Sequence, residues 1–170
     1  MKRILLLAAT IASVPAIVWA ASGQNYGAHL DGDAEVPARE TLAQGQAVLK
    51  LTPSGDSISY RLIASNIENV VQAHIHVGAS TEMGPVVAFL FGPVQTGGGR
   101  TDGVLATGTI TADDLIGPLT GGSIDDLVEE INSGNAYVNV HTNDGVAPPD
   151  TGPGDFPGGE IRGQIEVRGQ

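Results

Sequence analysis

The sequence predicts an all-β domain, an antiparallel β-sandwich of about eight strands with Greek-key-like connections and one short helix. Two observations carry this prediction. Short segments of alternating apolar and polar side chains recur along the chain, and the turns between them are rich in the 24 glycines and 10 prolines. Sustained helical spacing of apolar residues occurs in only one segment. A chain of 170 residues has room for one domain with a substantial core.

Eight segments carry the strand pattern. The second and third are joined by Pro53-Ser54-Gly55-Asp56, a strong turn signal, so they are predicted to form a hairpin. Residues 66–69 are expected to be a connector and residues 92–103 a glycine-rich loop. In the last strand Ile161, Ile165 and Val167 are predicted to point inward. The predicted strands are residues 26–30, 45–51, 57–62, 70–77, 86–91, 104–110, 136–141 and 160–167.

The single helix is predicted near residues 123–133. Ser123 and Asp126 have the spacing of a capping box, and Gly134 supplies a C-terminal stop. Apolar residues recur behind the cap at helical spacing, so the helix should pack as a lid on the sandwich. A similar signal at residues 111–114 is stopped within about one turn by Gly117-Pro118.

Residues 1–20 have the pattern of a secretory signal peptide. Lys2 and Arg3 precede an apolar stretch, and small residues frame a cleavage site after Ala20. The alternative is a membrane anchor, which Pro15 and the polar residues that follow the stretch disfavour. The expected organisation is a signal peptide over 1–20 and one domain over 21–170. The mature protein is then periplasmic or secreted and has no stable membrane anchor.

Composition narrows the classes of partner and chemistry. Loss of Lys2 and Arg3 with the signal takes the formal charge from −11 to −13. So acidic a domain repels phosphate backbones, and nucleic acid is not expected as a partner. The chain has no cysteine, which excludes disulfides, thiolate metal sites and a cysteine nucleophile.

Three histidines form the main candidate site. His74 and His76 are two positions apart in a predicted strand, so their rings project from one face, while His141 lies in a distant strand. Neutral imidazoles suit copper or zinc, and three of them with one open position make a site that could bind or activate a small molecule. The alternative is that these histidines are hydrogen-bonded structural residues.

Other polar residues are candidates to complete or support the site. His29 is a possible fourth ligand if its strand lies beside the histidine strand; otherwise it is polar surface. Glu160 and Arg162, two positions apart, are candidate second-shell groups. Glu160 could be a ligand or could hold a histidine tautomer, and Arg162 could attract an anion. The alternative is a structural role, either a cross-strand ion pair or a buried arginine that ties down loops, and Glu35 could be the partner of Arg162. The long loop 142–159 is expected to be flexible and solvated.

These motifs together resemble the CHRD domain, named for chordin and found also in bacterial exported proteins. The resemblance implies an all-β extracytoplasmic module, and it implies no assigned catalytic activity. The loop 142–159 is longer than the family pattern and is the main departure. The resemblance rests on Ala28-His29-Leu30-Asp31-Gly32, Glu35-Val36-Pro37, Ala73-His74-Ile75-His76, Gly84-Pro85-Val86-Val87, Tyr137-Val138-Asn139-Val140-His141-Thr142 and Gly159-Glu160-Ile161-Arg162-Gly163-Gln164-Ile165.

The chain is similar, more loosely, to the Cu,Zn superoxide dismutase sandwich. That similarity covers only the outline of His74-Ile75-His76 with a distant His141. A zinc-loop histidine cluster and a disulfide are missing, so the similarity implies no dismutase activity.

The sequence therefore favours an exported CHRD-type binding module with copper or zinc on a histidine face. One alternative is a copper metalloenzyme with superoxide-dismutase-like redox chemistry. Another is a structural or adhesive module that binds another protein without metal. The expected partner is a metal ion or an extracytoplasmic protein, and the small number of aromatic residues does not indicate a large obligate interface.

Overall fold

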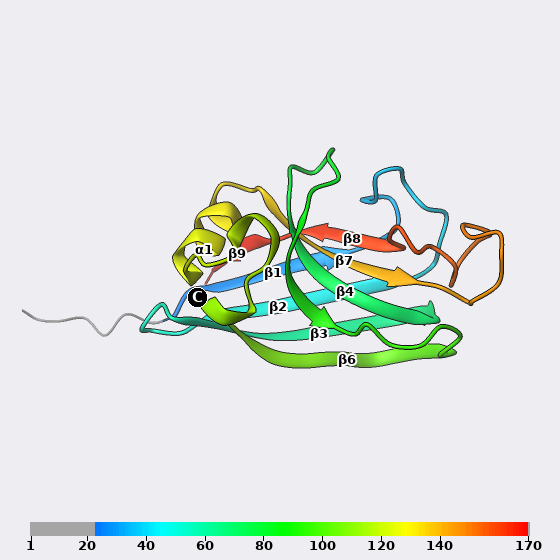
Figure 1. The fold of residues 1–170 in the computed structure, drawn as a ribbon, viewed down its shortest axis with the longest axis horizontal. Helices are drawn as coiled ribbons and strands as arrows, with labels where there is room; N and C mark the ends of the chain where they lie inside the picture. Colours follow the sequence, from blue (N-terminus) through cyan, green and yellow to red (C-terminus); the bar gives the residue numbers. More distant parts are fainter. Residues whose placement is uncertain (1–22, 170) are drawn as a thin grey trace, which may run out of the picture.

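A computed structural model describes residues 23–169. These residues form two antiparallel sheets packed face to face (Figure 1), which confirms the predicted all-β sandwich. One sheet has the strand order β6-β3-β2-β1-β9 and the other β5-β4-β7-β8. The predicted signal peptide, 1–20, lies outside the described residues. The strands are β1 (Asn25–Leu30), β2 (Gln44–Leu51), β3 (Ser57–Glu68), β4 (Val70–Val77), β5 (Val86–Phe91), β6 (Arg100–Thr111), β7 (Ala136–Thr142), β8 (Ile161–Gln164) and β9 (Glu166–Arg168).

The hairpin of β2 and β3 shows why the sequence forms this sandwich. Ala47 and Leu49 are buried while Val48 between them is exposed, as period-2 alternation requires. Ala47 is paired with Leu62 across the hairpin, and both point into the core between the sheets. Burial of these aligned apolar faces is the main force that holds the two sheets together.

Two strands are longer than predicted because they pair with each other. β3 continues through the expected connector to Glu68, and β6 begins at Arg100, inside the expected loop; these two residues are directly paired. Asn66 has a positive φ of 53° where the β3 register shifts. Its side chain accepts a 2.7 Å hydrogen bond from Arg100. Long-range pairing thus overrides the local glycine and asparagine signals.

The C-terminal strand is divided between the two sheets. Ile161 and Ile165 are buried as predicted, but the prediction for Val167 was wrong: it is 54% exposed. The chain passes from β8 in one sheet to β9 in the other, so the alternation of residues 160–165 does not continue to Val167. Gly163 allows β8 to approach β1 closely, because a Cβ there would overlap the carbonyl oxygen of His29.

The predicted helix is α1 (Ile124–Asn132), which packs at the end of the sandwich that also holds β9 (Figure 1). Asp126 accepts hydrogen bonds from the backbone N–H and the hydroxyl of Ser123, as the capping pattern predicted. Ile124, Leu127 and Ile131 are buried against the core. Short 3-10 helices, η1 (Ala112–Asp114) and η2 (Gly117–Leu119), precede it. Within residues 23–169 no helix is both long and apolar enough to cross a membrane.

Candidate metal centre

The predicted histidines lie on the outer face of the four-stranded sheet. On β4, Ala73 and Ile75 point into the core, so His74 and His76 point away from it. β7 alternates in the same way, with Tyr137, Asn139 and His141 on the outer face. Every residue of β7 is nevertheless buried, because this outer face is covered.

Three loops cover this face. The loop before β2, residues 31–43, places Glu35 against Asn139. The loop between β4 and β5, residues 78–85, and the loop between β7 and β8, residues 143–160, each contribute backbone oxygens to the histidines. The last of these was expected to be solvated, but near the site it packs against the sheet and Phe156 is buried. The histidine cluster is therefore an enclosed polar site and not an open sheet surface.

The structure brings His74, His76 and His141 together. One ring nitrogen from each of the three lies within 4.8 Å of the others, and all three residues are buried. His74 Nδ1 is 3.1 Å from His141 Nε2. The strand register causes this convergence: His141 is paired with Gln72, so it lies diagonally across from His74 on the same face. This group of histidines could hold a metal ion.

Backbone carbonyls fix the tautomers of two of the rings. His76 Nδ1 is 2.8 Å from the oxygen of Gly84, and His141 Nδ1 is 2.9 Å from the oxygen of Pro157. A carbonyl oxygen only accepts hydrogen bonds, so both Nδ1 atoms carry the proton and both Nε2 atoms carry a lone pair. His141 Nε2 then accepts a hydrogen bond from His74 Nδ1. The Nε2 atoms of His74 and His76 are buried and have no hydrogen-bond partner among the described residues.

Burial keeps the three imidazoles neutral. Loss of hydration, together with the neighbouring histidines, lowers the pKa of His74 to about 3. Burial lowers the pKa of His141 to about 4, although the hydrogen bond to Pro157 opposes the change. The pKa of His76 is also lowered, mainly by burial. At neutral pH the site therefore presents unprotonated nitrogens, the form that binds metal ions.

Arg162, a predicted second-shell residue, supports His76 indirectly. Its guanidinium carbon lies 3.4 Å from the centre of the Tyr137 ring, and the other neighbour of that ring is His76, stacked at 4.8 Å between centroids. The guanidinium also donates hydrogen bonds of 2.8 and 2.7 Å to the carbonyl oxygens of Glu82 and Ala79. Arg162 thus holds both the Tyr137 ring and the loop that orients His76.

Glu160, the other predicted second-shell residue, binds different groups from those expected. Its carboxylate accepts hydrogen bonds of 2.6 Å from both Thr41 and Thr142, and one of 2.9 Å from the backbone of Gly154. These partners come from two of the covering loops and from the end of β7. Glu160 therefore ties the loops to the sheet, and its hydrogen bonds reach no histidine.

Glu35 pairs with an amide and not with Arg162, which the sequence offered as one possible partner. The Asn139 Nδ2 group donates a 2.6 Å hydrogen bond to Glu35 Oε1. Burial raises the pKa of Glu35 to about 7, and the nearby charge of Arg162 limits the rise. The positive charge of Arg162 acts on Glu35 without a hydrogen bond between them. The two terminal nitrogens of Arg162 donate to the loop of residues 78–85, while its Nε is buried and has no partner among the described residues.

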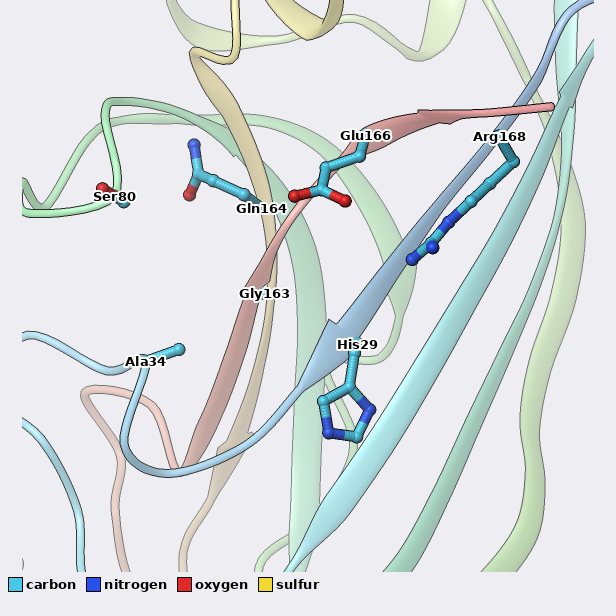
Figure 2. Close-up of a pocket in the computed structure, with 7 residues that line it drawn as sticks. All are labelled: His29, Ala34, Ser80, Gly163, Gln164, Glu166 and Arg168. Carbon is cyan, nitrogen blue, oxygen red and sulfur yellow. The ribbon is translucent and has the colours of Figure 1, made fainter.

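His29 does not join the cluster. β1 pairs with β2 and β9 in the five-stranded sheet, so it is not beside β4. The His29 side chain is 61% exposed and lies 3.8 Å from Asp31. His29 lines a pocket of about 240 Å³. Figure 2 shows it with Arg168 and Glu166, which line the same pocket. None of the three clustered histidines lines that pocket.

The sequence interpretation missed Tyr137, Asn139 and the Pro157 carbonyl. The first two share a strand face with His141 at spacings of four and two, so the alternation that placed His74 with His76 could have found them. A backbone oxygen from a long loop leaves no such signal.

Comparison with known proteins agrees with this architecture. No curated protein matches the sequence. A family model described as CHRD domain matches residues 26–149. The match extends from β1 through β7, and it includes all three clustered histidines together with Glu35 and Asn139. This chain belongs to the CHRD domain family.

Proposed function

We propose that this protein is an exported CHRD-type binding module that holds one copper or zinc ion between His74, His76 and His141. The observation that carries the proposal is the convergence of three neutral imidazoles, of which two have their Nδ1 protons directed to backbone carbonyls. Metal-binding histidines are commonly oriented by such a hydrogen bond on the other ring nitrogen.

The spacing of one nitrogen pair, His74 and His141, suits a metal ion. Bonds of about 2.0–2.1 Å in a tetrahedral zinc site separate ligand nitrogens by roughly 3.3 Å. The 3.1 Å between His74 Nδ1 and His141 Nε2 is close to that value. His76 offers Nε2, because its Nδ1 is committed to Gly84. Binding would move the His74 proton from Nδ1 to Nε2, with no change in the charge of the ring.

The donor set defines the class of metal. Imidazole nitrogen suits copper and zinc, whereas calcium and magnesium prefer oxygen ligands. Affinity of nitrogen sites for divalent ions peaks at copper, so copper is expected to bind more tightly than zinc when both are offered. Three protein ligands leave one position of a tetrahedral ion open.

Export is supported by the pattern of residues 1–20, which is that of a secretory signal.

Metal analysis of the purified mature protein tests the proposal. One equivalent of copper or zinc is expected in the wild type, and the doubly substituted His74→Ala/His76→Ala variant should bind none. His29→Ala is the matched control, because His29 is exposed and lies on the other sheet. Metal that is equally abundant in the double variant would refute the site.

The same samples separate binding from catalysis. A copper-loaded wild type that consumes superoxide no faster than the double variant supports a binding module. Consumption that requires both histidines supports the alternative of a copper metalloenzyme. A wild type that folds, binds its physiological protein partner and takes up no metal would support the structural module instead.

A further inference from the structure

Asn139 adjoins the three histidines through β4 and β7, and on its other side it is paired with Arg162 of β8. In the pairing of β4 with β7 it lies directly opposite His74, and it lies diagonally across from His76, which is opposite Tyr137. It is two residues from His141 on the same face of β7. Side chains at directly opposed positions are about 5 Å apart at Cβ, and diagonal neighbours are within reach of long side chains. These four side chains therefore form one continuous patch.

The amide of Asn139 has one satisfied end and one unsatisfied end. Nδ2 donates to Glu35, whereas Oδ1 is buried and has no partner among the described residues. The whole residue is 3% exposed. A buried acceptor without a partner is unfavourable, because it has lost its hydrogen bonds to water and gained none in return. Such an atom in a cluster of potential metal ligands points to a bound group that donates a hydrogen bond.

Glu35 determines which end of the amide faces its carboxylate. The ionised carboxylate only accepts hydrogen bonds, so it selects Nδ2 and leaves Oδ1 free. Gly159 closes the other side of this pair, because a Cβ at that position would overlap both Asn139 and Glu35. The orientation of the amide is thus fixed from outside the histidine cluster.

We propose that the open position of the metal ion holds a water molecule that donates a hydrogen bond to Asn139 Oδ1, with Glu35 as the positioning residue for that amide. This inference rests on the proposed function. It also predicts a selectivity: ligands that donate a hydrogen bond are favoured at the open position. An anion without a proton, such as azide, must leave Oδ1 unpaired.

The test uses the mature protein loaded with Cu²⁺ at pH 8, where Glu35 is ionised. Exchangeable proton couplings of a copper-bound water are measured by electron–nuclear double resonance in H₂O and D₂O, and azide affinity is measured by absorption titration. Asn139→Leu removes the acceptor at similar volume. It should keep one equivalent of copper, lose or shift the water couplings, and bind azide about ten-fold more tightly, since the cost of the unpaired oxygen is gone.

The chain offers a matched control and a second variant. Asn135 donates a 2.6 Å hydrogen bond to Glu130, the same chemical pair outside the histidine face, so Asn135→Leu should change neither readout. Glu35→Gln preserves Asn139 but no longer selects one end of its amide, so it should also shift the water couplings. This variant decides the question if Asn139→Leu does not fold.

Two results would overturn the inference, and they differ. The water site alone is refuted if the wild type binds copper but shows no exchangeable water. It is also refuted if the folded Asn139 and Glu35 variants have the same water couplings and azide affinity as the wild type. A wild type that binds no copper refutes the proposed function, and the water site with it.

Discussion

His74 Nδ1 lies 3.1 Å from His141 Nε2, although 67 residues separate the two in the chain. The contact is made across two neighbouring antiparallel strands, and each histidine belongs to the covered outer face. In the absence of metal this contact is a hydrogen bond. Its length is close to the distance between two ligand nitrogens of a tetrahedral metal ion. Proton and ion therefore compete for the same space between the two rings.

Metal binding is predicted to release few protons. Because the pKa values of His74 and His141 are lowered to about 3 and 4, both rings are already neutral at pH 6. Three ordinary histidines would release about two protons at that pH. Calorimetric zinc titrations at pH 6 in buffers of different ionisation enthalpy should give a value near zero. Release of two protons would show that the rings are not kept neutral.

The neutral histidines should also make the metal-free protein sensitive to acid. The pKa of His74 is about 3 in the folded state and near 6.5 unfolded, so the unfolded chain binds more protons between these values and stability falls as pH falls. Between pH 7 and 5 this residue alone costs about 2 kcal/mol. Urea unfolding with a chelator present measures the free energy of unfolding at pH 7 and pH 5. The decrease between these pH values should be about 2 kcal/mol smaller in His74→Leu than in the wild type. Equal losses would contradict the lowered pKa.

Glu35 is predicted to make the protein less stable as pH rises, which is the opposite of the effect of His74. Its folded pKa of about 7 lies above its ordinary value of 4.5, so its stabilising contribution is complete below pH 4.5 and is lost as pH rises through 7. The stability of Glu35→Gln relative to the wild type should rise across this window by on the order of 3 kcal/mol. Unfolding midpoints at pH 4.5 and 8 measure the change, and Glu130→Gln is the control. A pH-independent difference would place Glu35 in a solvated environment.

Loss of Arg162 should destabilise the loop of residues 78–85. Arg162→Met leaves the carbonyl oxygens of Ala79 and Glu82 without their charged donor and removes the cation from the Tyr137 ring. We expect a cost on the order of 3 kcal/mol in urea unfolding. Faster amide exchange at Gly84, whose N–H is bonded to the Tyr137 hydroxyl, should accompany it. Exposed Arg61→Met is the control, and an equally small effect of both substitutions would contradict this role.

Much of the fold could be predicted from the sequence because it depends on local alternation. The pattern in β2 and the cap of α1 are fully specified by neighbouring residues. The extension of β3 and β6 could not be predicted, since it depends on their mutual pairing. The exposure of Val167 follows from a change of sheet, which strand periodicity does not encode.

The candidate site divides in the same way. That His74 and His76 share a face follows from their spacing, but the position of His141 depends on the register of β4 and β7. The pairing of Asn139 with Glu35 joins residues 104 apart and was not predictable from either local segment. His29 resembled the others in its local pattern, and only the sheet order separates it from them.

Export has a direct test of its own. If residues 1–20 are removed by signal peptidase, mass spectrometry of the protein recovered outside the cytoplasm should give a chain that begins at Ala21. Substitution of Ala20 by a bulky residue should block this cleavage. Recovery of the intact chain from the cytoplasm alone would contradict export.

The most direct test of the metal centre is a crystal structure of the copper-loaded protein with anomalous scattering data collected at the copper edge. We predict a single strong peak about 2.0–2.1 Å from His74 Nδ1, His76 Nε2 and His141 Nε2. A peak at His29 or elsewhere on the surface, with His74 Nδ1 still bonded to His141 Nε2, would contradict the proposal.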